Sequence, residues 1–179
     1  MAENETPTGT GGAAGADAGQ QQQQTPPRLS ILTQYVKDLS FENPRAPNAM
    51  QSGQRPEIQI NVDTRGRPVE GDRYEAELQI NVNAKSDGET VFVCELTYGG
   101  LFAIANMPDN AVQPVLMIEC PRLLFPFARR VIADATRDGG FPPLMIDPID
   151  FLGLYRQRLQ QQQQQQNEAG GEEAPAGNA

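Results

Sequence analysis

Three stretches of the chain have a period of two: two alternate cleanly between apolar and polar side chains, and the third has Phe92, Cys94, Leu96 and Tyr98 on one face and Val93, Glu95 and Thr97 on the other. They read EIQINVDT at 57–64, YEAELQINVNA at 74–84 and TVFVCELTYGG at 90–100. Successive side chains of a β-strand point to opposite faces, so each stretch has one apolar face and one polar face. This pattern is typical of antiparallel strands that cover a core with one face and meet solvent with the other. The apolar positions are Ile58, Ile60, Val62, Tyr74, Ala76, Leu78, Ile80, Val82, Ala84, Phe92, Cys94, Leu96 and Tyr98.

A fourth strand is predicted in LSILTQYVKDLSF, 29–41, where the larger apolar side chains share one parity and Asp38 lies on the opposite face. The loop KSDGE, 85–89, contains an Asp-Gly pair, which favours a tight hairpin. The simplest topology for these strands is a meander. Gly99 and Gly100 interrupt the last strand and predict a bulge, a bend or a close backbone approach. The apolar set of the first strand is Leu29, Ile31, Tyr35, Leu39 and Phe41.

Two helices are predicted after the strands. The first starts at Pro121, unless Pro126 kinks it or marks its true start, and it ends at the glycines of DGG, 138–140. The second begins near DPIDF, with Asp147 as candidate N-cap and Pro148 at the first helical position. Strands followed by helices indicate an α+β domain. The two apolar stripes consist of Leu124, Phe127, Ala128, Val131, Ile132 and Ala135, and of Phe151, Leu154, Tyr155 and Leu159.

Both ends of the chain have a biased composition. Residues 1–27 are dominated by Gly, Ala, Thr and Gln, and residues 160–179 begin with seven consecutive glutamines. Segments of this kind bury too little apolar area to offset the entropy lost on ordering the backbone. We therefore expect a disordered extension at 1–27, a folded domain at 28–159 and a disordered, Gln-rich acidic tail at 160–179.

The formal net charge is −9, which disfavours nucleic acid and anionic lipid as partners and favours basic polypeptide segments. The N-terminus is acidic and lacks the apolar segment of a secretory signal. No stretch approaches the roughly 18 apolar residues of a membrane span. We expect a soluble, cytoplasmic protein without direct membrane insertion.

The sequence offers little for catalysis. It contains no histidine, which is the usual general base and a frequent metal ligand, and it has no phosphate-binding glycine loop. Cys94 and Cys120 lie among apolar residues and are predicted to be buried structural thiols. Glu75, Glu77 and Glu95 fall on polar strand faces, where carboxylates are usually only solvated. We therefore expect neither an enzyme nor a cofactor or metal site.

Apolar residues are abundant in the connecting segments. ENPRAPNAMQSG, 42–53, is a long Pro-rich crossover, and residues 99–130 are dense in Leu, Phe, Met and Ile. One interpretation is an ordinary core. The other is a subunit interface together with grooves for extended apolar peptides, in which Met and Phe side chains adapt to varied partners.

Three stretches together resemble the SecB protein-export chaperone family: YVKDLSFENPRAPN, VFVCELTYGGLFAIAN and CPRLLFPFARRVIADATRDGGFPPLMIDPIDFLGLY. The similarity covers about Leu29 to Leu159. The resemblance implies a four-stranded antiparallel sheet with two helices, assembled as a homotetramer that is a dimer of dimers. It also implies an ATP-independent holdase that keeps unfolded preproteins from folding and passes them to the SecA translocation ATPase.

The resemblance assigns roles to individual positions. The matches to SecA-binding positions are Asp38, Glu42, Val93 and Glu95. The candidates for a substrate groove are Ile58, Ile60, Val62 and Phe92. The face formed by Phe92, Cys94 and Leu96 is expected to pack beneath a helix and to support assembly. The C-terminal helix and tail match a second SecA contact of the family, and Gln54 lies near the place of a tryptophan common among relatives.

Two other functions remain compatible with the residues. A general holdase outside export, for example one that protects an aggregation-prone toxin, would share the fold and the grooves but ignore SecA. A non-chaperone adaptor would use the Gln-rich tails as its ligands.

Overall fold

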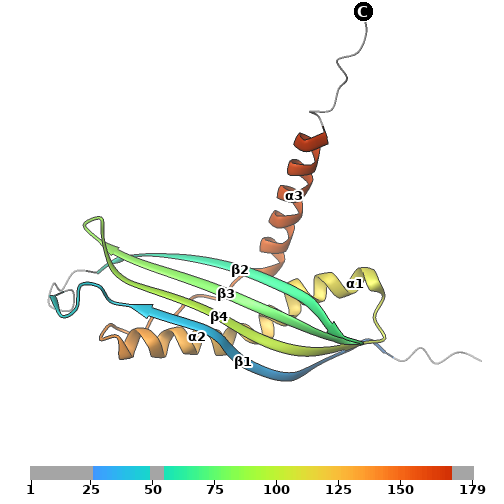
Figure 1. Ribbon diagram of the computed structural model, residues 1–179, viewed down its shortest axis with the longest axis horizontal. Coiled ribbons are helices and arrows are strands. Elements are labelled where there is room, and N and C mark those ends of the chain that lie inside the picture. Colours follow the sequence, from blue (N-terminus) through green and yellow to red (C-terminus); the bar gives the residue numbers. More distant parts are fainter. Residues whose placement is uncertain (1–25, 49–54, 171–179) are drawn as a thin grey trace, which may run out of the picture.

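The computed structural model describes residues 26–48 and 55–170, with side chains up to Gln166. Most of the predicted extension at 1–27, the middle of the crossover including Gln54, and residues 171–179 lie outside this part of the chain. The fold is α+β, with a four-stranded antiparallel sheet followed by helices (Figure 1), as predicted. The elements are β1 (Arg28–Glu42), β2 (Glu57–Glu70), β3 (Arg73–Ser86), β4 (Glu89–Ala105), α1 (Asp109–Pro114), the π-helical turn η2 (Val115–Glu119), α2 (Cys120–Asp138) and α3 (Phe151–Gly170).

The strand order is β1-β4-β3-β2, so the predicted meander is wrong for β1. Strands β2, β3 and β4 follow one another through hairpins, whereas β1 pairs with β4 and the crossover carries the chain to the opposite edge. This is the Greek-key arrangement with the long connection first. The predicted hairpin at 85–89 is confirmed, because Asp87 and Gly88 both have positive φ, 52° and 80°, as a tight primed turn requires.

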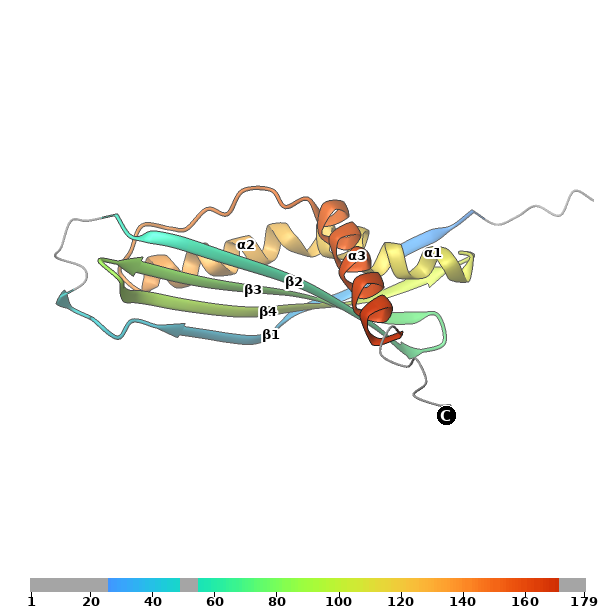
Figure 2. The ribbon, with the colours of Figure 1, turned by 90° about the horizontal axis from the view of Figure 1, so that it is seen from above.

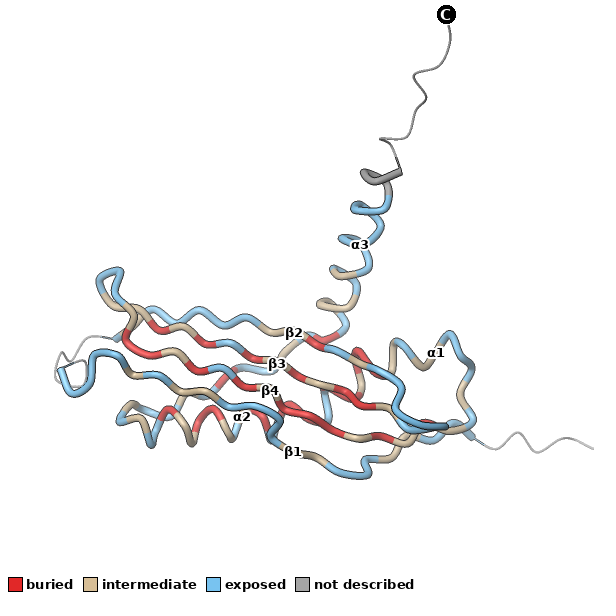
Figure 3. Tube along the Cα trace, in the orientation of Figure 1, coloured by how far each residue is buried: buried red, intermediate tan, exposed pale blue. Residues whose placement is uncertain are grey.

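Helices cover one face of the sheet. In the described part of the chain no helix covers the other face (Figure 2), which carries Glu75, Glu77 and Glu95 and which we call the bare face. Helix α2 and the connector that follows it lie on the same side of the sheet (Figure 2), and the residues of β3 and β4 on that side are buried (Figure 3). The predicted alternation is confirmed on these two strands. The core-facing side chains include Ala76, Leu78, Ile80, Val82, Ala84, Phe92, Cys94, Leu96 and Phe102 from the sheet, and Cys120, Leu124, Ala128 and Ile132 from α2.

The glycine pair produces a close approach rather than a bulge. Strand β4 runs through Gly99 and Gly100 without a break. A Cβ atom on Gly100 would lie 2.8 Å from a methyl carbon of Leu124, and one on Gly99 would lie 2.7 Å from the ring of Tyr35. The irregularities lie on the partner strand β1, where Leu32 and Lys37 are the extra residues at two register shifts.

These register shifts change which side chains of β1 point to the core. Tyr35 pairs with Gly99 and Val36 with the core-facing Tyr98, whereas Leu39 and Phe41 pair with the buried Leu96 and Cys94. Tyr35 therefore lies on the bare face, opposite to the predicted single parity. The reason is that each extra residue reverses the alternation of side chains.

The first helical segment begins earlier than predicted. It starts at Asp109, contains the π turn Val115–Glu119, and includes Pro126 within α2. Leu116 in this early part packs over Gly66 of β2, where an added Cβ would lie 3.1 Å away. The predicted end is confirmed, since α2 stops at Asp138 and Gly140 has φ 88°.

The second helix, α3, begins and ends at other residues than predicted. Its first-turn N–H at Gly153 donates to Asp150 Oδ1 at 3.0 Å, so Asp150, not Asp147, is the capping side chain. The helix continues past Leu159 to Gly170, into the segment predicted to be a disordered tail. Glutamine has good helix propensity, which favours this extension of an established helix.

Residues Asp109–Asp138 are long and apolar enough to cross a membrane by length and composition, and 39% of the qualifying window is buried within the structure. A helix that packs on the core of a soluble protein passes the same test. Here Leu116, Leu124 and Ile132 are buried, and α2 packs on β3 and β4.

Candidate functional site

The bare face of the sheet brings together the four residues matched to partner docking. On β1 and β4, Glu42 pairs with Val93, Ser40 with Glu95 and Asp38 with Thr97. Because Phe41 pairs with the buried Cys94, the neighbouring pairs point away from the core. Asp38, Glu42 and Glu95 are exposed and Val93 is half-buried. We call Asp38, Glu42 and Glu95 the acidic patch.

The strands beside the acidic patch carry mainly amides at the positions level with it, and Lys85, two residues beyond Asn83 on β3, is a cation on this face. The facing residues of β3 that align with Val93, Glu95 and Thr97 are amides, and so are their neighbours on β2 apart from Asp63. A surface of this kind attracts basic groups, and the attraction depends on ionic strength. The amide-bearing positions are Gln59, Asn61, Gln79, Asn81 and Asn83.

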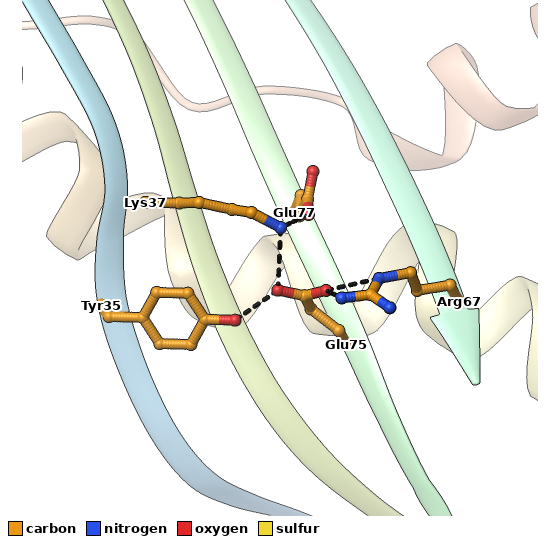
Figure 4. A network of polar contacts seen from close by, with 5 residues as sticks. All are labelled: Tyr35, Lys37, Arg67, Glu75 and Glu77. Carbon is orange, nitrogen blue, oxygen red and sulfur yellow. Dashed lines mark hydrogen bonds and ion pairs between the residues drawn. The ribbon is translucent and has the colours of Figure 1, made fainter. Parts of the chain in front are cut away.

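The other half of the same face holds a network of charged side chains around Glu75 (Figure 4). Lys37 Nζ lies 3.1 Å from Glu75 Oε1, and Arg67 Nε donates to Glu75 Oε2 at 2.6 Å. Tyr35 donates its hydroxyl to Glu75, and Lys37 also pairs with Glu77. We call these five residues the Glu75 network.

The Glu75 network spans the four strands of the sheet, and it can do so because Gly99 of β4 has no side chain beneath it. Tyr35 and Lys37 start on β1 and reach over β4 to Glu75 and Glu77 on β3, while Arg67 approaches from β2 (Figure 4). The crossing passes over Gly99, where a side chain would collide with the Tyr35 ring.

Glu75 is only 4% exposed, so the expectation of a merely solvated carboxylate is wrong for this residue. Burial by itself raises the pKa of the Glu75 carboxyl, but the hydrogen bonds from Tyr35, Lys37 and Arg67 outweigh it and hold the pKa below its ordinary value. A single parity along the whole of β1 would point Tyr35 toward the core, so the sequence does not predict its contact with Glu75.

Edge strand β2 places three of the predicted groove residues on the helix side of the sheet. Ile58, Ile60 and Val62 pair with Ala84, Val82 and Ile80, which are buried. Ile58 and Ile60 nevertheless remain 40% and 37% exposed.

Beyond Val62, a cavity of about 180 Å³ lies between β2 and α3. Arg158 of α3, which sequence reasoning missed, borders this cavity and donates to the Thr64 carbonyl at 2.6 Å. It also pairs with the Asp63 carboxylate.

The fourth predicted groove residue, Phe92, is not at this surface. It is 2% exposed. Its ring stacks on Phe41, with centroids 5.7 Å apart, and lies tilted against Phe141, with centroids 4.9 Å apart. Its assignment to a groove is therefore wrong for the single chain, while its place on the core face with Cys94 and Leu96 agrees with their burial.

Both cysteines are buried free thiols, as predicted. Burial, reinforced by the neighbouring charge of Glu95, raises the pKa of Cys94 to about 11. Burial together with Glu119 raises the pKa of Cys120 to about 12. Thiols with such pKa values carry almost no thiolate at neutral pH, so neither is suited to act as a nucleophile.

Comparison with known proteins identifies the family. The family model described as preprotein translocase subunit SecB matches residues 21–162. The protein-export protein SecB of Azorhizobium caulinodans is 50% identical over 147 residues, which cover 82% of this chain and 92% of the relative. SecB of Parvibaculum lavamentivorans is 49% identical over 162 residues, covering 90% of this chain and 94% of that protein.

A solved structure supports the fold. A SecB-like chaperone of Mycobacterium tuberculosis, in complex with a ChAD peptide from the HigA1 antitoxin, superposes with a TM-score of 0.59. Its sequence is 13% identical, and the match covers 68% of this chain and 91% of that one. With the family match over most of the chain, these findings show that this protein belongs to the SecB family of protein-export chaperones.

Proposed function

We propose that this protein is an ATP-independent holdase of the cytoplasm, which binds unfolded preproteins and delivers them to the SecA translocation ATPase. The proposal rests on one observation. The exposed acidic patch of Asp38, Glu42 and Glu95 lies on the bare face of the sheet, whereas exposed apolar side chains of β2 lie on the opposite face. One chain can thus offer separate surfaces to a basic partner and to an apolar client.

Client binding follows from apolar area that the fold leaves uncovered. Ile58 and Ile60 are exposed on the helix side of an edge strand, and Val62 follows them beside the cavity at α3. Burial stabilises a complex by about 25 cal/mol per Å² of apolar area. A long unfolded chain therefore binds through many weak contacts, and a folded protein, which hides such segments, is ignored.

We also propose assembly into a homotetramer, a dimer of dimers. Edge strand β1 exposes Ile31, Leu32, Val36 and Leu39, and α2 exposes Leu123 and Phe127 on the side away from the sheet. Apolar surfaces of this kind are typical of contacts between subunits. A tetramer multiplies the client-binding strands, so that one client is held at several places at once.

The first test uses a denatured, slow-folding preprotein diluted into buffer without nucleotide. We expect stoichiometric amounts of this protein to suppress light scattering and to delay folding of the preprotein. A folded protein of similar size serves as the control client. If scattering is unchanged while circular dichroism shows that the chaperone is folded, the holdase function is excluded and the adaptor function takes its place.

The second test separates export from general holding. Reversing one charge of the acidic patch, in Glu95→Lys, should weaken binding to purified SecA at least tenfold and leave suppression of aggregation intact. Asp147→Lys, the same charge reversal at an exposed position of the connector between α2 and α3, measures the general effect of added positive charge. Unchanged SecA affinity in Glu95→Lys contradicts the delivery step and favours a general holdase.

A further inference from the structure

The bare face of the sheet is electrically divided. Beside the acidic patch the facing residues are acidic, amide or uncharged, apart from Lys85 near the end of β3, which pairs with Glu57. At the other end of the face, the cations Lys37, Arg65 and Arg67 each lie within 4 Å of a carboxylate. Lys37 stands at the boundary, because it directly precedes Asp38 in the chain.

The side chain of Lys37 leans away from the acidic patch. Its ammonium contacts Glu75 and Glu77, which pair with Leu101 and Gly99 of β4. Along the same strand, Asp38 pairs with Thr97, and Glu95 lies two residues farther in the opposite direction. The Lys37 side chain therefore runs diagonally over β4, toward the end of the face that does not hold the acidic patch (Figure 4).

An untethered Lys37 would behave differently. A lysine has a flexible four-carbon stem and a compact charge, and neighbouring strands lie about 4.8 Å apart. Without Glu75 and Glu77, two other carboxylates would remain near this position: Asp38 is the next residue in the chain, and Glu95 lies two residues from the Thr97 that pairs with Asp38. Any pairing with them would neutralise part of the acidic patch. A partner docked on the patch would then also be repelled or attracted by the Lys37 charge, because charges closer than the Debye length of about 8 Å are only weakly screened from one another.

We propose that Glu75 and Glu77 are positioning residues for SecA docking, which hold the Lys37 ammonium away from the acidic patch so that its carboxylates stay uncompensated. This inference rests on the docking function proposed above. Glu75 is fixed by Tyr35 and Arg67 as well, so the anchor for Lys37 is rigid. Glu77 is less buried, with its side chain 14% exposed, and is the better position for a substitution that leaves the fold intact.

A double-mutant cycle tests this role with purified SecA and the full-length protein. The variants are Glu77→Gln, Lys37→Gln and the two combined, and the measurement is the dissociation constant at low salt. We expect Glu77→Gln to weaken binding by up to about fivefold, the range of exposed ion pairs, and to have no effect when Lys37 is already replaced. An equal loss in both backgrounds means that Glu77 acts only as one more negative charge, and overturns the inference.

Two control variants distinguish a failure of this inference from a failure of the proposed docking function. Glu57→Gln removes an exposed carboxylate of β2 whose strand position pairs with Lys85, so its effect should be the same with and without Lys37. Glu95→Lys tests docking itself: if it leaves SecA affinity unchanged, the proposed function fails and this inference fails with it. If Glu95→Lys weakens docking but Glu77→Gln acts equally in both backgrounds, only the inference fails.

Discussion

At the scale of single residues, Gly99 makes the Glu75 network on the bare face possible. Gly99 has no side chain, so the Tyr35 ring lies over β4 and reaches Glu75 on the next strand. This places a buried carboxylate on a face that alternation alone assigns to solvent. The desolvation of Glu75 is offset by three hydrogen-bond donors, the condition under which a buried charge is tolerated.

We predict that Glu75→Gln lowers the free energy of unfolding by about 1–3 kcal/mol, the cost of disrupting a buried hydrogen-bonded group. The loss should depend on pH. Because the folded-state pKa of Glu75 lies below its ordinary value of 4.5, its stabilisation is present above pH 4.5 and disappears as the pH falls through the lower, folded-state value. Urea unfolding of the two proteins between pH 7 and pH 3 should show the difference shrinking below pH 4.5. A constant difference contradicts this account.

Gly99→Ala should destabilise the wild type by about 1 kcal/mol, because the new Cβ meets the Tyr35 ring at 2.7 Å and displaces it from Glu75. In a Tyr35→Ala background the same change should be neutral or stabilising by about 0.5 kcal/mol, since glycine weakens a strand. Thermal unfolding of the four proteins measures this coupling. Equal effects in both backgrounds would show that the ring does not require the glycine.

At the scale of elements, the sequence predicted the three hairpin-linked strands well and β1 less well. Along most of β3 and β4 one face is buried and the other is not, and this difference is visible in the local sequence as an alternation of apolar and polar residues. The extra residues Leu32 and Lys37 of β1 follow from pairing with β4. At the two shifts the partners are 71 residues (Ile31 and Phe102) and 59 residues (Asp38 and Thr97) apart in the chain, so parity within 29–41 does not reveal the extra residues. The early start of the first helix has the same cause, since Leu116 is placed by its contact with Gly66 of β2.

The four residues that resemblance matches to docking lie together on the bare face because of their positions on two adjacent strands. Each lies on the polar side of its strand, and β1 pairs with β4 directly. The Glu75 network and the Arg158 contact were not predicted, because both join side chains from distant elements whose neighbourhood depends on strand order. The resemblance places Phe92 both in the groove and on the core face, and in the single chain its side chain is buried.

Arg158 is predicted to fix α3 on strand β2. Arg158→Gln removes the ion pair with Asp63 and the hydrogen bond to the Thr64 carbonyl, so amide hydrogen exchange in 151–166 should become faster while exchange in β3 and β4 stays the same. Arg156→Gln, at an exposed position on the same helix, is the matched control. Equal exchange in the two variants would show that Phe151 and its neighbours hold the helix without Arg158.

Client holding should depend on the helix-side face of β2. Ile60→Asp introduces a charge where the proposed client contact is apolar, and we expect the concentration needed to suppress aggregation to rise at least threefold, since burying a charge is costly. Asn61→Asp adds the same charge on the bare face of the same strand and should leave holding unchanged. A loss of holding in both variants would point to charge alone rather than to this surface.

At the scale of the whole molecule, the sheet separates two kinds of interaction. Its bare face carries charged and amide side chains, and its other face meets the helices and leaves apolar side chains exposed only near the edges. The two proposed binding events should therefore respond differently to the solvent. Charge attraction on an exposed face is screened by salt, whereas burial of apolar area is not.

We predict that raising the ionic strength from about 0.05 M to about 0.5 M weakens SecA docking at least tenfold, because the Debye length shrinks from about 14 Å to about 4 Å and screens the acidic patch. Holding of an unfolded client should stay constant or strengthen over the same range. Calorimetry with SecA and light scattering with a denatured preprotein, in the same buffers, provide the comparison. The Glu95→Lys variant should show a smaller salt dependence of its residual docking, because fewer ion pairs remain to be screened. If docking and holding fall together with salt, the two faces are not independent and clients too are held mainly by charge.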